Sequence, residues 1–103
     1  MATLIVFASP ANAASEQEWL DWYSATHIPE LRAAIPEVGT VTQHKLLGPP
    51  DRLPRYATIY EAIGIDAPTL ASRLGAAAPT LSQTELMAVG DDAPALHFAD
   101  PLQ

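Results

Sequence analysis

The residues best suited to chemistry lie in the short stretch Trp22-Tyr23-Ser24-Ala25-Thr26-His27-Ile28-Pro29. A histidine titrates near neutral pH, and His27 follows Tyr23 by four residues, so both fall on one face of a helix. Trp19 and Trp22 supply flat apolar walls, which suit an aromatic or polycyclic ligand with one polar edge. The pattern predicts an apolar small-molecule pocket in which His27 and Tyr23 are catalytic. Alternatively, His27 bonds a carbonyl near a kink at Pro29, and the aromatic residues are ordinary core.

Further candidates lie on the predicted strands. Tyr60 and Thr58 share one face of the segment 55–62, where Tyr60 would stabilise an enolate or phenolate oxygen if that face lined the pocket. If it does not, the same face forms a subunit interface, and spacing does not decide between the two. Spacing likewise does not decide whether His44, on the predicted strand 40–47, faces the pocket or a subunit interface. The predicted substrate contacts are Trp19, Trp22, Phe7, His44 and Thr58.

The sequence predicts neither a metal site nor a cofactor site. Glu30 follows His27 by three residues, but Pro29 between them breaks the helical register that would bring them together. The glycines are isolated and form no phosphate-cradling loop. The serines stand in no nucleophile-elbow sequence, so hydrolase chemistry has no support either.

Length, charge and cysteine usage limit the class of protein. A chain of 103 residues predicts one domain, residues 1–103. The net charge of −7 repels phosphate backbones, and the five Lys and Arg residues form no basic stripe, so nucleic acid is not an expected partner. The apolar run 4–8 is too short for a membrane span and has no basic flank. With no cysteine present, these features predict a cytoplasmic protein without membrane contact.

Local sequence patterns predict four strands, two main helices and one short helix. Strands are expected at 3–9, 40–47, 55–62 and 84–89, with 94–98 as either a continuation of the last or a tail. A capping box of Ser15 and Glu18 starts a helix at residue 16, and Pro29 ends or kinks it at 27 or 28 before a short helix over 29–34. Asp66 caps a second long helix over 67–77.

This order of elements predicts the ferredoxin-like α+β fold, βαββαβ with an antiparallel sheet. Its helices cover one face of the sheet. The other face carries apolar side chains that a monomer leaves exposed, which predicts a homodimer.

Two motifs carry a family resemblance. The run Glu18-Trp19-Leu20-Asp21-Trp22-Tyr23, followed by His27-Ile28-Pro29-Glu30-Leu31, resembles the E-F-x-x-W-Y-x-x-x-H-x-P stretch of EthD-like dimeric α/β barrel proteins. The run Arg55-Tyr56-Ala57-Thr58-Ile59-Tyr60-Glu61 resembles their third strand, and the match covers about the first two-thirds of the chain. The resemblance implies a ferredoxin-like monomer that pairs sheet to sheet, with a cavity between the sheet and the helices. It also implies kinship with cofactor-free polyketide cyclases, muconolactone isomerases, quinol-forming monooxygenases and proteins without assigned activity.

The leading functional hypothesis is a cofactor-independent cyclase or isomerase of secondary metabolism. It would act on a hydrophobic, aromatic or polyketide-like carbonyl compound, with His27 as general acid/base and Tyr23 or Tyr60 stabilising the oxyanion. One alternative is a non-catalytic small-molecule binding or accessory protein. Another is a cofactor-free monooxygenase.

Overall fold

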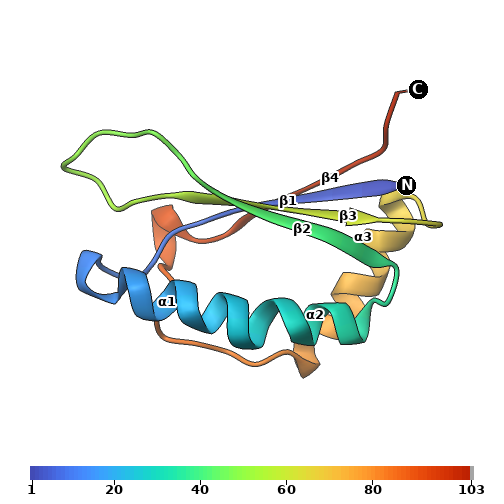
Figure 1. The fold of residues 1–103 in the computed structure, drawn as a ribbon, viewed down its shortest axis with the longest axis horizontal. Helices are drawn as coiled ribbons and strands as arrows, with labels where there is room; N and C mark the ends of the chain where they lie inside the picture. Colours follow the sequence, from blue (N-terminus) through green and yellow to red (C-terminus); the bar gives the residue numbers. More distant parts are fainter. Residues whose placement is uncertain (103) are drawn as a thin grey trace.

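A four-stranded antiparallel sheet covered by helices on one face forms the computed structural model, which describes residues 1–102 (Figure 1). The strands are β1 (Ala2–Ala8), β2 (Val38–Lys45), β3 (Tyr56–Ala62) and β4 (Ala95–Ala99), in the spatial order β2-β3-β1-β4. The α-helices are α1 (Glu16–Trp22), α2 (Ile28–Ala34) and α3 (Ala67–Ala77). Element order and sheet topology together confirm the predicted ferredoxin-like α+β class.

Strand alternation decides which side chains meet the helices. In β1 the buried residues are the even-numbered ones, among them Leu4 and Val6. In β3 the tyrosine face is buried, with Tyr60 fully buried and Thr58 2% exposed. Direct pairing of Leu4 with Tyr60 places both on the same side of the sheet. The sequence left open which face of this strand meets the helices. In the structure it is the tyrosine face that does so.

The first helix begins at Glu16 as predicted, but its cap differs from the predicted one. The Ser15 side chain makes no capping hydrogen bond. Asn12 instead accepts hydrogen bonds at its Oδ1 from the Ser15 amide and the Ser15 hydroxyl, both at 2.9 Å, and so caps the 3₁₀ turn η1 (Ala13–Ser15). The capping residue is therefore Asn12 rather than Ser15, because the 3₁₀ turn η1 precedes the α-helix.

This helix does not end at residue 27 or 28. One π-helical turn, η2 (Tyr23–His27), joins α1 directly to α2, and the Ile28 amide donates to the Tyr23 carbonyl five residues back. Pro29 has no N–H and its ring clashes with the carbonyl four residues earlier in a regular α-helix. The wider turn relieves that conflict, so the chain continues as one helical rod (Figure 1).

The second half of the chain both confirms and corrects the expected elements. The α3 helix spans the predicted residues, and the Asp66 side chain accepts from the Thr69 amide at 2.9 Å. The predicted strand 84–89 is wrong: its one β-type pairing is an isolated bridge between Pro10 and Met87. The fourth strand is β4, which pairs antiparallel with β1. The Arg55 guanidinium fixes the turn before β4 by donating to the carbonyls of residues 92 and 93.

The face of the sheet opposite the helices carries half-buried apolar side chains. Ile5, Phe7 and Ile59 lie there, with Ile5 paired to Ile59 across the strands. Within residues 1–102, no helix combines the length and the apolar character needed to cross a bilayer.

Candidate functional site

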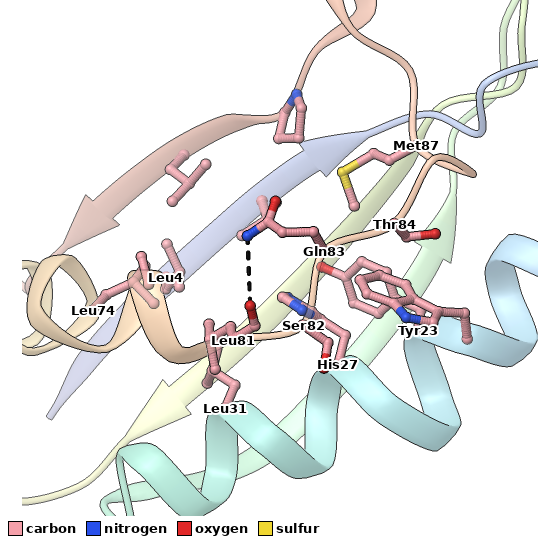
Figure 2. A pocket seen from close by; sticks show the side chains of 15 residues that line it. Leu4, Tyr23, His27, Leu31, Leu74, Leu81, Ser82, Gln83, Thr84 and Met87 are labelled. Atoms are coloured by element: carbon pink, nitrogen blue, oxygen red, sulfur yellow. Dashed lines mark hydrogen bonds between the residues drawn. The ribbon is translucent and has the colours of Figure 1, made fainter.

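A cavity of about 250 Å³ lies between the sheet and the helical layer (Figure 2). Five parts of the chain form its walls: strands β1 and β4, the α1–α2 rod, the end of α3, and the segment 81–87. The lining residues are Leu4, Val6, Trp22, Tyr23, His27, Leu31, Leu74, Ala78, Leu81, Ser82, Gln83, Thr84, Met87, Pro94 and Leu96. The site therefore sits where the family resemblance implied a cavity, and most of its surface is aliphatic.

The π turn brings His27 into this cavity. Residues four apart on an α-helix drift by about 40° per step around the axis, so a regular helix would carry the series Trp19, Tyr23, His27 and Leu31 steadily off one face. A π turn holds more residues per turn and reverses the drift for the step from Tyr23 to His27. Consequently Trp19, Tyr23 and Leu31 are all buried towards the sheet, and His27 faces the cavity.

His27 lies in an aromatic and mostly apolar environment. Its ring stacks on Trp22, with centroids 5.3 Å apart and planes at 25°, and lies 4.7 Å from the Tyr23 ring. Nδ1 is buried and has no hydrogen-bond partner among the described residues. Burial lowers the pKa of His27, while the nearby Glu30 carboxylate opposes that shift. His27 is thus a neutral imidazole at pH 7, whose ring forms part of the cavity wall while its Nδ1 is covered by protein.

Tyr23 and Tyr60 form a buried pair beneath the histidine. Their hydroxyl oxygens lie 3.0 Å apart. Burial raises the pKa of both phenols, most strongly for Tyr60. Both remain protonated at neutral pH, so the pair contains two O–H donors. Tyr23 lines the cavity whereas Tyr60 lies behind it, so Tyr60 reaches the site through the Tyr23 hydroxyl.

The segment 81–87, here called the strap, runs along the α1–α2 rod and closes one side of the cavity (Figures 1 and 2). The Glu30 carboxylate accepts from the Ser82 amide at 2.7 Å and from the Ser82 hydroxyl at 2.6 Å. At its other end, the Leu86 carbonyl accepts from the Ala11 amide at 2.6 Å. Sequence reasoning did not identify the strap as part of the site, because it has neither helical nor strand periodicity to show which residues point inwards.

The aliphatic lining residues of the strands and helices were also missed. Leu4, Val6 and Leu31 follow the same periodicities as the core, so the sequence gives no sign that they border a cavity rather than packed protein. Only their alternation with exposed neighbours marks them as facing inwards.

The predicted substrate contacts divide into three groups. Trp22 lines the cavity. Trp19 and Thr58 are buried on the helical side of the sheet but lie outside the lining. The Trp19 ring packs in the core, 5.5 Å from Tyr23 and 5.3 Å from Tyr56 between centroids.

Phe7 and His44 do not belong to this cavity. Phe7 pairs with Ala57 in β3, and His44 pairs with the same residue from β2, so both lie on the face opposite the helices. Strand alternation sends the odd-numbered side chains of β1, and the even-numbered ones of β2 beyond its bulge between Val38 and Val41, away from the cavity. Phe7 instead contacts the His97 ring edge-on, at 5.7 Å between centroids.

The cavity holds no permanent charge. None of the Lys or Arg residues lines it, and His27 is its one titratable nitrogen base. Within the part of the chain that the structure covers, no three His, Cys, Asp or Glu side chains gather as a metal-binding group would require. The chemistry available from the lining side chains is proton transfer at His27 and hydrogen bonding by Tyr23 and by the Gln83 amide.

No protein-family model and no curated protein matches the chain. Among solved structures, it is similar to an ethyl tert-butyl ether D (EthD) family protein from Bacillus halodurans. The two share 15% identity, with 99% of this chain and 100% of that chain covered, and superpose with a TM-score of 0.43. The family named for that structure is the one that the motifs around Trp22 and Arg55 resemble.

Proposed function

We propose that this chain is a cofactor-independent enzyme of the cyclase or isomerase type, acting on a hydrophobic carbonyl compound. The neutral His27 imidazole takes a proton from the carbon next to the ligand carbonyl. The Tyr23 hydroxyl donates to the oxygen as the enolate forms, and Tyr60 is a positioning residue for that hydroxyl. Return of the proton to another carbon completes an isomerisation. In a cyclisation the enolate carbon instead forms a bond to a second carbonyl carbon of the same molecule, whose C=O π bond breaks, and the resulting alkoxide takes the proton from the imidazolium.

The place of the His27 ring in the cavity wall carries the proposal. The ring lines a mostly apolar cavity and lies 4.7 Å from the Tyr23 ring between centroids. Burial lowers the pKa of this imidazole. A lowered pKa favours the unprotonated form that a general base needs.

A non-catalytic binding protein is the second candidate, and a specific observation favours it. The hydroxyls at the site already have partners inside the chain: Tyr23 with Tyr60, Ser82 with Glu30, and Thr84 with the Leu86 amide. A site whose remaining polar side chains are the His27 imidazole and the Gln83 amide suffices for binding alone.

Hydrogen–deuterium exchange separates the two candidates. With 2-tetralone, a neutral bicyclic ketone, in D₂O, proton NMR follows loss of the signal from the carbon next to the carbonyl. The C–H bond breaks as His27 takes the proton, and a C–D bond forms when the exchanged imidazolium returns a deuteron. We expect the protein to accelerate exchange and His27→Ala to reduce the acceleration about a hundred- to ten-thousand-fold. His97→Ala, on the opposite face, is the matched control. Binding of 2-tetralone without accelerated exchange would favour the binding protein.

The proposal includes a homodimer that packs through the open sheet face. Ile5, Phe7 and Ile59 are apolar and half-buried there. A second copy would remove these side chains from water, which stabilises the association.

A further inference from the structure

One polar group in the cavity wall is left without a strong partner. Polar side chains line the cavity at five positions: Tyr23, His27, Ser82, Gln83 and Thr84. The three hydroxyls have hydrogen-bond partners inside the chain, and His27 is the proposed base. The side-chain amide of Gln83 is therefore the group that remains to recognise a ligand.

The Gln83 amide makes one weak contact with the described residues. Its Nε2 lies 3.5 Å from the Leu81 carbonyl, two residues back along the strap. Most N–H···O hydrogen bonds in proteins are about 2.7–3.2 Å long, so this contact is at the weak limit. An amide carries two N–H donors and one carbonyl acceptor, and Leu81 engages one donor at most. Among residues 1–102, the second N–H and Oε1 have no partner.

The strap places this amide at the mouth of the cavity. The neighbouring Ser82 amide is held by Glu30 at 2.7 Å, and the Leu86 carbonyl is held at 2.6 Å by an amide of the loop after β1, so the backbone is fixed on both sides of Gln83. Gln83 lines the cavity and is also exposed, which places it where the cavity meets solvent. Figure 2 shows its side chain extending from the strap, whereas His27 comes from the helical rod. The base and the amide thus belong to different walls.

A ligand in the cavity would cover part of this amide and displace the water that solvates it. An amide that loses water without gaining a hydrogen bond costs free energy, so a wholly apolar ligand binds at a disadvantage. A carbonyl oxygen of the ligand would restore the bond, because it is the ordinary acceptor for an amide N–H. The amide is uncharged and no Lys or Arg lines the cavity, so nothing at this position favours an ionised acceptor over a neutral one.

We infer that Gln83 determines specificity by donating from Nε2 to a second, uncharged carbonyl oxygen of the ligand at the mouth of the cavity. This inference rests on the proposed function, in which His27 and Tyr23 act on the first carbonyl. The substrate class narrows to hydrophobic compounds with two carbonyl groups, one inside the cavity and one beside the strap. Contacts at two points fix the orientation of the ligand and so determine which carbon meets the base.

Isothermal titration calorimetry at pH 7 with two matched pairs of compounds tests the inference. The pairs are 6-acetyl- and 6-isopropyl-2-tetralone, and 7-acetyl- and 7-isopropyl-2-tetralone, whose members are similar in shape and differ in the second carbonyl. The affinity for the acetyl compound divided by that for the isopropyl compound gives a ratio for each pair. In at least one pair, we expect this ratio to be about three- to tenfold larger for the unmodified protein than for Gln83→Leu, the net effect of one hydrogen bond.

Comparing ratios separates recognition from a structural role of Gln83. Hydration of the free compounds is the same for both proteins, and a loosened strap would weaken both members of a pair alike. Gln83→Glu, which keeps the shape of the side chain but has no N–H donor, should lower the ratio as well. Glu85→Leu, at an exposed strap position outside the lining, is the matched control and should keep the ratio of the unmodified protein.

The inference is overturned if Gln83→Leu leaves the ratios of both pairs unchanged, or if Glu85→Leu lowers them as much. Binding of 2-tetralone without binding of any substituted compound overturns it too. If exchange of 2-tetralone still depends on His27 in these cases, the proposed function stands without a role for Gln83. If neither 2-tetralone nor any substituted compound binds, both fail.

Discussion

At the scale of single residues, the site depends on one histidine kept neutral by its surroundings. His27 stacks on Trp22, and burial disfavours its charged form. Its proposed partner Tyr23 is held by a hydroxyl pair with Tyr60 that stays protonated because burial raises the pKa of both phenols. At pH 7 the unprotonated His27 imidazole can accept a proton, and the protonated Tyr23 phenol can donate a hydrogen bond. Proton-transfer chemistry requires these two different protonation states.

The lowered pKa of His27 makes folding stability dependent on pH. Below the ordinary histidine pKa of about 6.5, the unfolded chain binds a proton that the folded chain resists, so stability is full above that pH and falls as the pH drops. We expect urea denaturation to show a smaller loss between pH 7.5 and pH 5.5 in His27→Gln than in the unmodified protein. An equal loss in both would mean that burial does not perturb this histidine.

The tyrosine pair should behave as a coupled unit. Tyr23→Phe leaves the Tyr60 hydroxyl buried without a partner, and Tyr60→Phe does the reverse, so each should cost about 1–3 kcal/mol of unfolding free energy. The double variant should cost less than the sum of the two, because no orphaned hydroxyl remains. Strict additivity in a denaturation cycle would show that the 3.0 Å contact contributes nothing.

At the scale of elements, the π turn and the strap decide where the cavity is. The π turn keeps His27 on the buried face of the α1–α2 rod, and the strap closes the space beside it. Glu30 joins the two, since it stands three residues after His27 and accepts both hydrogen bonds from Ser82.

Loss of the Glu30 contact should loosen the strap without unfolding the protein. In Glu30→Ala, hydrogen exchange measured by mass spectrometry should rise over residues 81–87, and affinity for 2-tetralone should fall several-fold because one wall becomes mobile. Glu18→Ala, an exposed position on the same rod, is the control and should change neither. Protection of the strap equal to that of the unmodified protein would show that its backbone contacts near Leu86 suffice.

The sequence predicted most of these elements but not the π turn or the strap. Periodicity located the α3 helix to the residue, because Asp66 provides a local cap. Pro29 was interpreted as a helix end or kink, because local rules count its missing donor but not the gain from burying Trp19, Tyr23 and Leu31 together. Residues 84–89 have strand-like composition, yet the structure places 84–87 in the strap. His27 and Trp22 could be placed from spacing, whereas Phe7 and His44 could not, because strand alternation does not say which face meets the helices.

At the scale of the whole molecule, the two faces of the sheet have different roles. One face packs under the helices and borders the cavity. The other is open in the single chain and exposes Ile5, Phe7 and Ile59 in part. The proposed dimer joins two such faces and leaves each cavity on the outside of the barrel.

A charge in the middle of the open face should break the dimer. Ile59→Lys places two ammonium groups at the proposed interface, where neither has a partner. Sedimentation velocity should show a dimer for the unmodified protein and a monomer for the variant. Ser24→Lys, exposed on the helical side, should remain dimeric. A monomeric unmodified protein would contradict the proposed association.

The most direct test of the central claim is whether a ligand meets His27. Nitrogen-15 NMR of histidine-labelled protein resolves both ring nitrogens of the three histidines, His27, His44 and His97. On addition of 2-tetralone, we predict a shift at the ring nitrogens of His27, with His44 and His97 unchanged. Saturating binding that leaves both His27 nitrogens unmoved would contradict the account.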